Sequence, residues 1–358
     1  MEKVGLDWFE GVYAGKRILV TGHTGFKGSW LTVWLQLMGA EVYGLSLKAD
    51  GPQNHWELLN LDVSHMYADI RDSEAVTGFI EKIQPHFVFH LAAQSLVLDS
   101  YADPLKTWST NVLGTATLLE ACRNVEELQG VIVVTTDKCY ENKGWVWGYR
   151  ETDTLGGLDP YSASKACTEL VVSSFKQSFF KVKNAPLIAT ARAGNVIGGG
   201  DWSENRLVPD LVRSIEAGIA LEIRSPEATR PWQHVLDCLG GYLCLGRHLI
   251  QGNKSVAESF NFGPGVESNK SVSTILNLFG RYWPSSSWRT VSNAGNAEAQ
   301  ILHLDSAKAR AKLNWRPVWS LEKSVQETVN WYRSLMESEC VESRNQIESY
   351  MKDSRDQL

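Results

Sequence analysis

A glycine-rich turn between an apolar run and an apolar helical pattern is the feature that most constrains the fold of this chain. The run Ile18–Thr21 is short enough for one buried strand, and it breaks at Gly22. Glycines recur at Gly25 and Gly28 in the spacing G-x-x-G-x-x-G, and a helical pattern then continues to about Met38. This order of strand, tight turn and helix places backbone N–H groups where a pyrophosphate can bind.

The same spacing also occurs in tight turns between a strand and a helix that bind nothing. Here the turn ends the first expected strand, which is where a dinucleotide-binding fold has its phosphate site. We therefore predict a dinucleotide cofactor held by Gly22, Gly25 and Gly28, with Thr24 and Phe26 between them.

Composition limits the class of protein to which the chain can belong. Its 358 residues suit one large domain or two smaller ones. The net charge of −6 with no concentrated basic stripe argues against nucleic acid as a partner, and no apolar run approaches the ~20 residues that span a bilayer. Six scattered cysteines and no signal peptide before Lys16 favour a cytoplasmic protein. His86 and His90 lie in a strand pattern without a third ligand, so we expect no metal site.

Apolar runs that suit buried strands alternate with helical patterns along the chain. The further strands that we expect are Glu41–Leu47, Tyr67–Ile70, Phe87–Gln94, Val131–Lys138, Leu187–Arg192 and Asn261–Gly263. Helices are expected to begin at Asn111 and at Pro160. The pattern predicts an α/β fold, a Rossmann-type doubly wound parallel sheet with a smaller, discontinuous C-terminal substrate lobe.

The alternation weakens after Arg192, which suggests how the chain is divided. We expect the dinucleotide-binding domain at residues 14–195 and 232–262, the substrate lobe at 196–231 and 263–335, and a frayed tail or loose terminal helix at 336–358. Arginines in the lobe suit phosphate binding, solvent exposure or pairing with glutamates. The arginines are Arg206, Arg224 and Arg230, and the glutamates are Glu204, Glu222 and Glu227.

The end of the second expected strand bears on the choice of cofactor. An acidic residue there accepts from the adenosine ribose in NAD enzymes, but this chain has Ser46, followed by Lys48. Asp50 is a displaced candidate for that role. The predicted cofactor is therefore NAD, with NADP left open. Asp69 suits either a contact with the adenine amino group or a helix cap for the segment that begins at Asp72.

A tyrosine and a lysine share one face of the helix expected from Pro160. Tyr161 and Lys165 are four residues apart, a spacing that also arises by chance in amphipathic helices. A phenol with a pKa near 10 is a poor base at neutral pH, and a neighbouring ammonium with a cationic nicotinamide would favour phenolate. In open parallel sheets, ligands bind at the carboxyl ends of the strands. We therefore expect Thr136, Asp137 and Lys138, at the end of their strand, to face the same site as Tyr161 and Lys165.

Taken together, these motifs resemble the extended short-chain dehydrogenase/reductase superfamily, and within it the sugar nucleotide 4,6-dehydratases, over about residues 15 to 335. The motifs that carry the resemblance are the glycine turn, Asp69-Ile70, Leu91-Ala92-Ala93, Asn111, Thr136-Asp137 and Tyr161-x-x-x-Lys165. Those dehydratases usually have Thr-Asp-Glu where this chain has Thr-Asp-Lys. This lysine, together with the segments 22–28 and 230–237, makes the sequence most similar to the dehydratases that act on CDP-glucose.

The resemblance implies an NAD-dependent hydro-lyase that works on a nucleotide sugar in deoxysugar biosynthesis of the O-antigen type, as a homodimer or homotetramer. It implies that Tyr161 takes the proton of the sugar 4-hydroxyl, that Lys138 removes the C5 proton and that Asp137 protonates the departing 6-hydroxyl. Thr136 would share the 4-hydroxyl, and Lys165 would bind the nicotinamide ribose.

The resemblance also implies two sets of binding residues. The cofactor set is Gly22, Thr24, Gly25, Phe26, Gly28, Ser46, Asp69, Ile70, Leu91, Ala92, Ala93, Asn111, Tyr161 and Lys165. The substrate set is Asn195, Arg206, Arg230 and His234. A dehydratase linked to dTDP or GDP, a nucleotide-sugar 4-epimerase and a non-catalytic dinucleotide sensor remain alternatives.

Overall fold

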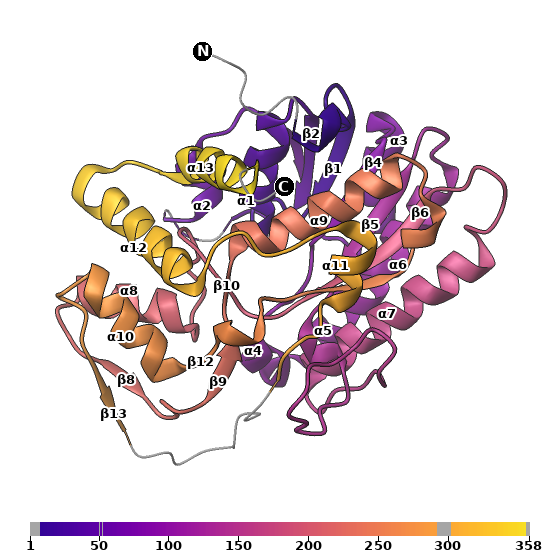
Figure 1. The fold of residues 1–358 in the computed structure, drawn as a ribbon. Helices are drawn as coiled ribbons and strands as arrows, with labels where there is room; N and C mark the ends of the chain where they lie inside the picture. The colour runs from indigo at the N-terminus through magenta and orange to yellow at the C-terminus, as the bar shows by residue number, and fades with distance from the viewer. Residues whose placement is uncertain (1–7, 50, 52, 292–301, 356–358) are drawn as a thin grey trace.

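A parallel sheet of seven strands, in the order β11-β6-β5-β4-β1-β2-β3, organises the computed structural model, which describes residues 8–49, 51, 53–291 and 302–355 (Figure 1). Its strands are β1 (Arg17–Thr21), β2 (Glu41–Ser46), β3 (Ser64–Tyr67), β4 (Phe87–His90), β5 (Gly130–Val134), β6 (Leu187–Ala193) and β11 (Ser259–Phe262). The order reverses between β1 and β4, where a doubly wound sheet opens a crevice for ligands. The predicted α/β class is confirmed.

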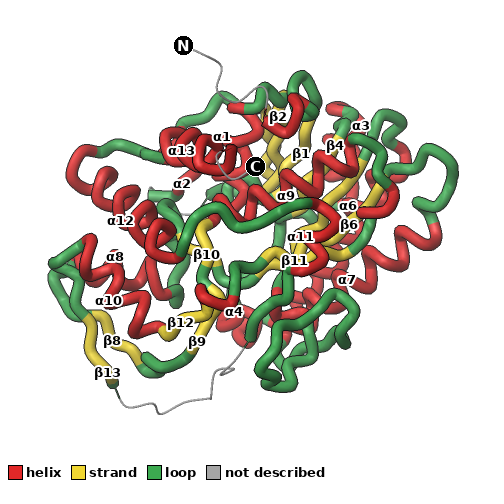
Figure 2. Tube along the Cα trace, in the orientation of Figure 1, coloured by secondary structure: helices red, strands yellow, loops and turns green. Residues whose placement is uncertain are grey.

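Helices cover both faces of this sheet (Figures 1 and 2). One face is covered by α3 (Ser73–Ile83), α6 (Gly114–Ala121) and α7 (Pro160–Ser178), and the other by α1 (Phe26–Leu37) and α9 (Val235–Ile250), with α13 (Ser343–Arg355) packed on α1. Burial on both faces explains why β5 is apolar along its whole length. No helix in the described part of the chain is long and apolar enough to cross a membrane.

A smaller lobe of helices and short sheets lies beside the carboxyl ends of the strands (Figure 1). Its helices are α8 (Leu207–Glu216), α10 (Val272–Tyr282) and α12 (Leu321–Ser338). The short sheets pair β7 (Val196–Ile197) with β10 (Gln233–His234), β8 (Leu221–Ile223) with β13 (Trp288–Thr290), and β9 (Thr229–Pro231) with β12 (Asn269–Ser271). The boundaries proposed for the two domains, 14–195 with 232–262 and 196–231 with 263–335, stay a prediction.

The remaining helical segments are short. They are α2 (His55–Leu59), α4 (Val97–Ala102), α5 (Pro104–Trp108), α11 (Ala307–Leu313), a π-helical turn (Ser109–Leu113) and the 3-10 turns Trp8–Gly11, Cys122–Asn124, Asp137–Cys139, Lys254–Val256 and Val266–Ser268. Asn111 therefore lies inside a continuous helical stretch that begins at Pro104, so the prediction that a helix begins there is wrong. The sequence pattern missed the preceding turn because its apolar Leu105 and Trp108 face outward, which obscures the usual helical periodicity.

Three expected strands also differ in extent from the structure. The third strand is Ser64–Tyr67 and ends before Asp69, so the prediction of a strand at Tyr67–Ile70 is wrong. The fourth ends at His90, where the prediction extended it to Gln94. The fifth is Gly130–Val134, where the prediction extended it to Lys138. After His90 the sequence stays apolar through Ala93, and apolar periodicity alone does not mark where the chain leaves the sheet.

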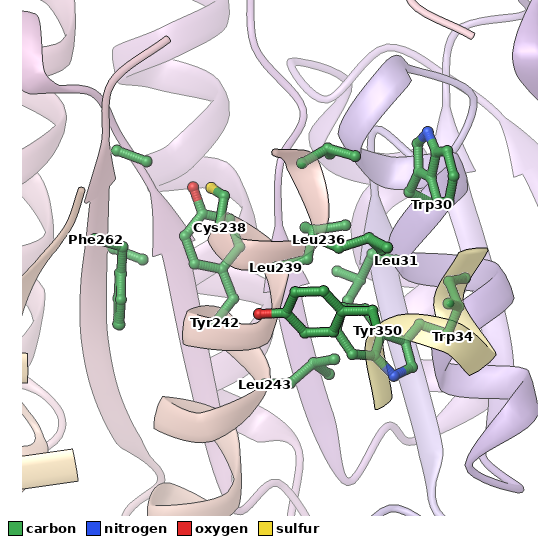
Figure 3. Packing of buried hydrophobic residues seen from close by; sticks show 14 of the residues in the cluster. Trp30, Leu31, Trp34, Leu236, Cys238, Leu239, Tyr242, Leu243, Phe262 and Tyr350 are labelled. Atoms are coloured by element: carbon green, nitrogen blue, oxygen red, sulfur yellow. The ribbon is translucent and has the colours of Figure 1, made fainter. Parts of the chain in front are cut away.

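The C-terminal segment is not a frayed tail. Helix α13 buries Ile347, Tyr350 and Met351 completely or nearly so, and the ring of Tyr350 stands edge-on to Trp34 of α1 with their centroids 5.4 Å apart. Figure 3 shows Tyr350 beside Trp34 and the α9 residue Leu239. Of the two predicted alternatives, the frayed tail is wrong. The terminal helix is present but docked, because a few apolar side chains at helical spacing suffice to dock a helix whose other positions are polar.

A buried carboxyl group joins three elements in this region. Asp237 lies in the first turn of α9 and accepts hydrogen bonds from the backbone N–H of Val318 at 2.6 Å and from the Tyr350 hydroxyl at 2.8 Å. Burial raises its pKa from an ordinary 3.8 to about 7, against the effect of these donors. The carboxyl therefore keeps its proton in the folded protein at pH values where the unfolded chain has lost it.

This difference predicts that Asp237 lowers the free energy of unfolding as the pH rises from about 4 to 7, by up to about 1 kcal/mol per pH unit. Asp237→Asn keeps an oxygen acceptor and removes the titration. In urea unfolding, we expect the stability of the variant relative to the parent to increase between pH 5 and pH 7. Asp72→Asn, at the exposed cap of α3, is the control, and a relative stability of Asp237→Asn that is flat with pH would contradict the assignment.

Candidate active site

The glycine turn leaves room for backbone only. Gly22 has a φ of +74°, and a Cβ added to it would lie 2.8 Å from the backbone nitrogen of Ala92. A Cβ on Gly28 would lie 2.0 Å from the carbonyl oxygen of Gly22. Gly25 caps α1 and has no side chain to occupy the N–H groups of its first turn. These N–H groups are therefore available to an anion.

The segment after β4 closes the other side of the crevice. The backbone N–H of Leu91 donates to the Thr21 carbonyl at 3.0 Å, and that of Ala92 donates to the Thr21 hydroxyl at 3.2 Å. The half-buried stretch Leu91–Ala93 therefore lies beside the glycine turn at the point where the strand order reverses. The structure brings together two motifs that are about 70 residues apart in the sequence.

Asn111 links this loop to the helix that carries the tyrosine. Its side-chain amide donates to the Gln94 carbonyl at 3.0 Å and to the Ser164 hydroxyl at 2.8 Å, and its oxygen accepts from the Gln94 N–H at 2.9 Å. The amide is buried, and both of its N–H groups donate to protein groups. Asn111 therefore positions α7, and the cofactor contact that the resemblance implies for it stays a prediction.

The five predicted catalytic residues lie together at the end of β5. Helix α7 begins at Pro160 with Asp159 as its cap, and the Lys165 ammonium donates to the Val134 carbonyl at 3.0 Å. The Thr136 hydroxyl caps the 3-10 turn that follows β5 and donates to the Asp137 carboxylate at 3.0 Å.

Two further members complete this group. Tyr161 also forms a hydrogen bond with Thr136. Lys138 is half-buried one residue beyond Asp137, and its backbone N–H donates to the Thr136 hydroxyl at 3.3 Å. The hydroxyl of Thr136 is thus the common neighbour of the phenol and the turn.

Burial dominates the ionisation of this group. It raises the pKa of Tyr161 to about 12, while the Thr136 hydrogen bond and the positive charge of Arg206 lower it. Burial and the charge of Lys27 lower the pKa of Lys165 to about 8. Burial also raises the pKa of Asp137, against the charge of Lys138. A carboxyl whose pKa is raised is suited to donate a proton, and the phenol needs further positive charge before it can accept one.

The side chains expected around the adenosine form hydrogen bonds with neighbouring protein side chains. The Ser46 hydroxyl, 6% exposed, lies 3.0 Å from both the Thr24 hydroxyl and Nδ1 of His23. Asp69 receives two hydrogen bonds from the Arg71 guanidinium, at 2.9 and 2.6 Å. Asp50 lies outside the described residues.

The structure also places the cap of α3 and the side chain of Ile70 on this side of the crevice. Asp72 is the cap of α3, so the alternative that Asp69 is this cap is wrong. The side chain of Ile70 is buried where a Cβ on Gly114 would meet it at 2.6 Å, which leaves only its backbone near the crevice.

The four predicted substrate residues separate into two groups. Arg206 is paired with Asp201 at 2.9 Å rather than with Glu204, and its charge acts on Tyr161. The charge of Arg230 acts on Asp137. Asn195 is half-buried in the connection from β6 to β7. These three lie on segments that border the catalytic group.

His234 does not belong with them. It is fully buried, caps α9 through Nδ1, and packs against Trp30 and Trp319 with ring centroids 6.2 and 4.7 Å away. A side chain without exposed surface in the core cannot contact substrate, so this prediction is wrong.

The sequence reasoning also missed residues that act on the site. Lys27 lies in the first turn of α1, and its charge lowers the pKa values of both Lys165 and Asp137. A cation at a helix N-terminus is unfavourable, so this residue could have been singled out. Glu169, one turn beyond Lys165, forms a buried two-bond pair with Arg192 at 2.9 Å and accepts from Thr190 at 2.7 Å. The pair ties α7 to β6.

Comparison with known proteins gives a family for this arrangement. The family model of GDP-mannose 4,6 dehydratase matches residues 19–328. The chain belongs to this family. It is 44% identical over 349 residues to the CDP-glucose 4,6-dehydratase of Salmonella typhimurium, covering 95% of this chain and 97% of that protein.

Two solved structures are also similar to this family member. The dTDP-glucose 4,6-dehydratase DesIV from Streptomyces venezuelae, solved with NAD bound, has a TM-score of 0.75 and 27% identity over 89% of this chain and 97% of that one. The UDP-glucose 4-epimerase from Thermotoga maritima, solved with UDP-glucose, has a TM-score of 0.77 and 25% identity over 89% and 99%. Dehydratases and epimerases thus share this fold.

The glycine turn provides a direct test of the dinucleotide site. Gly28→Ala places a methyl group against the Gly22 carbonyl, and overpacking of this kind typically costs about 1–3 kcal/mol. We expect the dissociation constant for NAD, measured by titration, to rise about tenfold or more. Gly78→Ala in α3 is the matched control, because its added Cβ meets nothing within 4 Å. Unchanged binding by Gly28→Ala would exclude this turn as the pyrophosphate site.

Proposed function

We propose that this family member is a CDP-glucose 4,6-dehydratase, which converts CDP-glucose into CDP-4-keto-6-deoxyglucose and water with NAD as its resident cofactor. The observation that carries the proposal is the group formed by Thr136, Asp137 and Lys138 against Tyr161. An acid and a base beside the phenol are needed for elimination, whereas an epimerase has no use for them. The identity to the Salmonella dehydratase supports CDP as the nucleotide.

The dinucleotide site fits NAD, because the crevice between β1 and β4 admits only backbone at Gly22 and Gly28. These glycines with Gly25 would hold the pyrophosphate, and Lys165 would bind the nicotinamide ribose. When bound, NAD supplies a hydride acceptor for C4 and a hydride donor for C6. Ser46 carries no charge to repel a 2′-phosphate, so we also propose weak discrimination against NADP.

The side chains of the catalytic group have separate proton-transfer roles in the proposal. Tyr161 accepts the proton of the sugar 4-hydroxyl while Thr136 holds that hydroxyl, and the ammonium of Lys165 stabilises the phenolate. The C5 proton is acidic once C4 is a ketone, and Lys138 removes it. Asp137 then protonates the departing 6-hydroxyl, which leaves as water. C5 regains a proton from solvent as C6 receives the hydride that came from C4, so the cofactor would end in the state in which it began.

Incubation with nucleotide sugars tests this function. We expect CDP-glucose to give a 4-keto sugar, detected by its absorbance in alkali, at a higher kcat/KM than dTDP-, UDP- or GDP-linked substrates. Tyr161→Phe is the control and should bind NAD without forming product. A second candidate, a nucleotide-sugar 4-epimerase, is favoured only by the fold that it shares, and it would give CDP-galactose with no keto product.

Variants at Asp137 and Lys138 separate the elimination from the oxidation. Asp137→Asn cannot donate a proton, so cofactor reduction should still be seen in a single turnover while water loss slows, typically by about 10²–10⁴-fold. Lys138→Met should suppress the exchange of the C5 hydrogen with solvent by a similar factor. If Lys138→Met exchanges C5 and turns over like the parent, the base is another residue and Tyr161 is the next candidate.

Apolar side chains exposed on neighbouring helices support a homodimer or homotetramer. They lie on α4, α5, the π-helical turn and α7, with Leu105 being 79% exposed. The others are Leu98, Tyr101, Leu113 and Leu170. We propose that a second copy covers this face, because exposed apolar surface of this kind marks an interface. Leu105→Glu should reduce the sedimenting mass, and Val266→Glu in the lobe should not; a monomeric parent protein would contradict the proposal.

We also place the enzyme in the cytoplasm and in deoxysugar biosynthesis. Its six cysteines are free thiols, as is usual in a reducing compartment, and the proposed product is a precursor of deoxysugars.

A further inference from the structure

A chain of buried hydrogen bonds runs from the C-terminal helices to the glycine turn. Nε1 of Trp331 donates to the Ser343 hydroxyl at 2.9 Å, and that hydroxyl lies 2.7 Å from Nε2 of His55. Nδ1 of the same histidine lies 2.7 Å from the Ser29 hydroxyl, which lies 2.9 Å from the Gly25 carbonyl oxygen. All four side chains are buried, and they connect α12, α13, α2 and the first turn of α1.

The donors in this chain have a consistent direction. The indole of Trp331 can only donate, so Ser343 accepts from it and its own hydrogen is free for Nε2 of His55. Burial lowers the pKa of His55 to about 3, so the ring is neutral and has one donor nitrogen and one acceptor nitrogen. Nδ1–H then donates to Ser29, whose hydroxyl lies 2.9 Å from the carbonyl oxygens of both Gly25 and Phe26 and donates into the first turn of α1. Every hydrogen in the chain has an acceptor.

The packing around the two rings leaves them little freedom. A Cβ on Gly199 would lie 2.0 Å from the Trp331 ring, and a Cβ on Gly200 would lie 2.6 Å from the His55 ring. The carbonyl of Gly199 also accepts from Nε1 of Trp30 at 2.9 Å. Because the rings cannot shift, the hydrogen-bond chain fixes Ser29 relative to the C-terminal helices.

We propose that His55 and Ser343 are positioning residues for the cofactor, which hold the first turn of α1 in the orientation that binds the pyrophosphate. The proposal rests on the proposed function only in that the glycine turn binds NAD. The hydrogen-bond chain ends at the carbonyls of Gly25, the cap of α1, and Phe26, its first residue, so it acts on the turn whose N–H groups would meet the phosphates. The C-terminal helix α13 thereby contributes to cofactor affinity from outside the sheet domain.

Titration of NAD against purified variants, without any sugar substrate, tests the proposal. Ser343→Ala breaks the chain at one hydroxyl, and a hydrogen bond of this kind is typically worth about 1 kcal/mol, so we expect the dissociation constant to rise about fivefold. The value of kcat at saturating NAD should stay within about twofold, because the group around Tyr161 is untouched. Ser349→Ala, on the same helix but outside the hydrogen-bond chain, is the matched control.

Substitutions of the histidine distinguish positioning from mere stability. His55→Leu should weaken NAD binding at least as much as Ser343→Ala, while His55→Asn keeps an amide donor near Nδ1 and should restore part of the affinity. A fall in Tm with an unchanged dissociation constant in Ser343→Ala would overturn the proposal, and Ser343→Ala decides it if the histidine variants do not fold. Failure of CDP-glucose turnover would leave this NAD titration unaffected, so the two proposals fail separately.

Discussion

The close approach of two backbone segments at Gly22 and Gly28 is the constraint on which the rest of the structure depends. A carbonyl oxygen stands where any side chain on Gly28 would be, so β1 and α1 meet at one angle only. That angle brings the first turn of α1 to the crevice where the strand order reverses, beside the segment that follows β4. The Ser29–His55–Ser343 hydrogen-bond chain reaches the same turn from α13 and gives its own buried polar groups partners.

The chemistry depends on how α7 is placed against the end of β5. The ammonium of Lys165 on the Val134 carbonyl, the amide of Asn111 on Ser164, and the Glu169–Arg192 pair fix the helix at three levels. Buried ion pairs of this kind stabilise little by themselves but are costly to break, so they restrict the helix to one register. In that register Tyr161 contacts Thr136, and Asp137 and Lys138 follow Thr136 in the 3-10 turn.

The residues of the strand–turn–helix unit were sufficient to predict the fold, because glycine spacing and apolar periodicity act over short distances. The positions of Tyr161, Lys165 and the polar end of β5 could also be predicted, because these side chains share one helix face or one strand end. Contacts that depend on packing between distant segments could not be predicted from the sequence. His234 faces the core rather than the substrate, Asn111 ties the loop after β4 to α7, and α13 docks through Tyr350 although most of its side chains are polar.

The central claim is that oxidation, elimination and reduction occur in one site, and hydrogen tracing tests it most directly. CDP-glucose deuterated at C4 is converted by the parent enzyme in ordinary water, and the product is examined by NMR and mass spectrometry. If the three steps share one site, the deuterium appears at C6 of the keto sugar, within the same molecule, while C5 takes its hydrogen from solvent. Loss of the deuterium to solvent, or its retention at C4, would contradict a single site for the three steps.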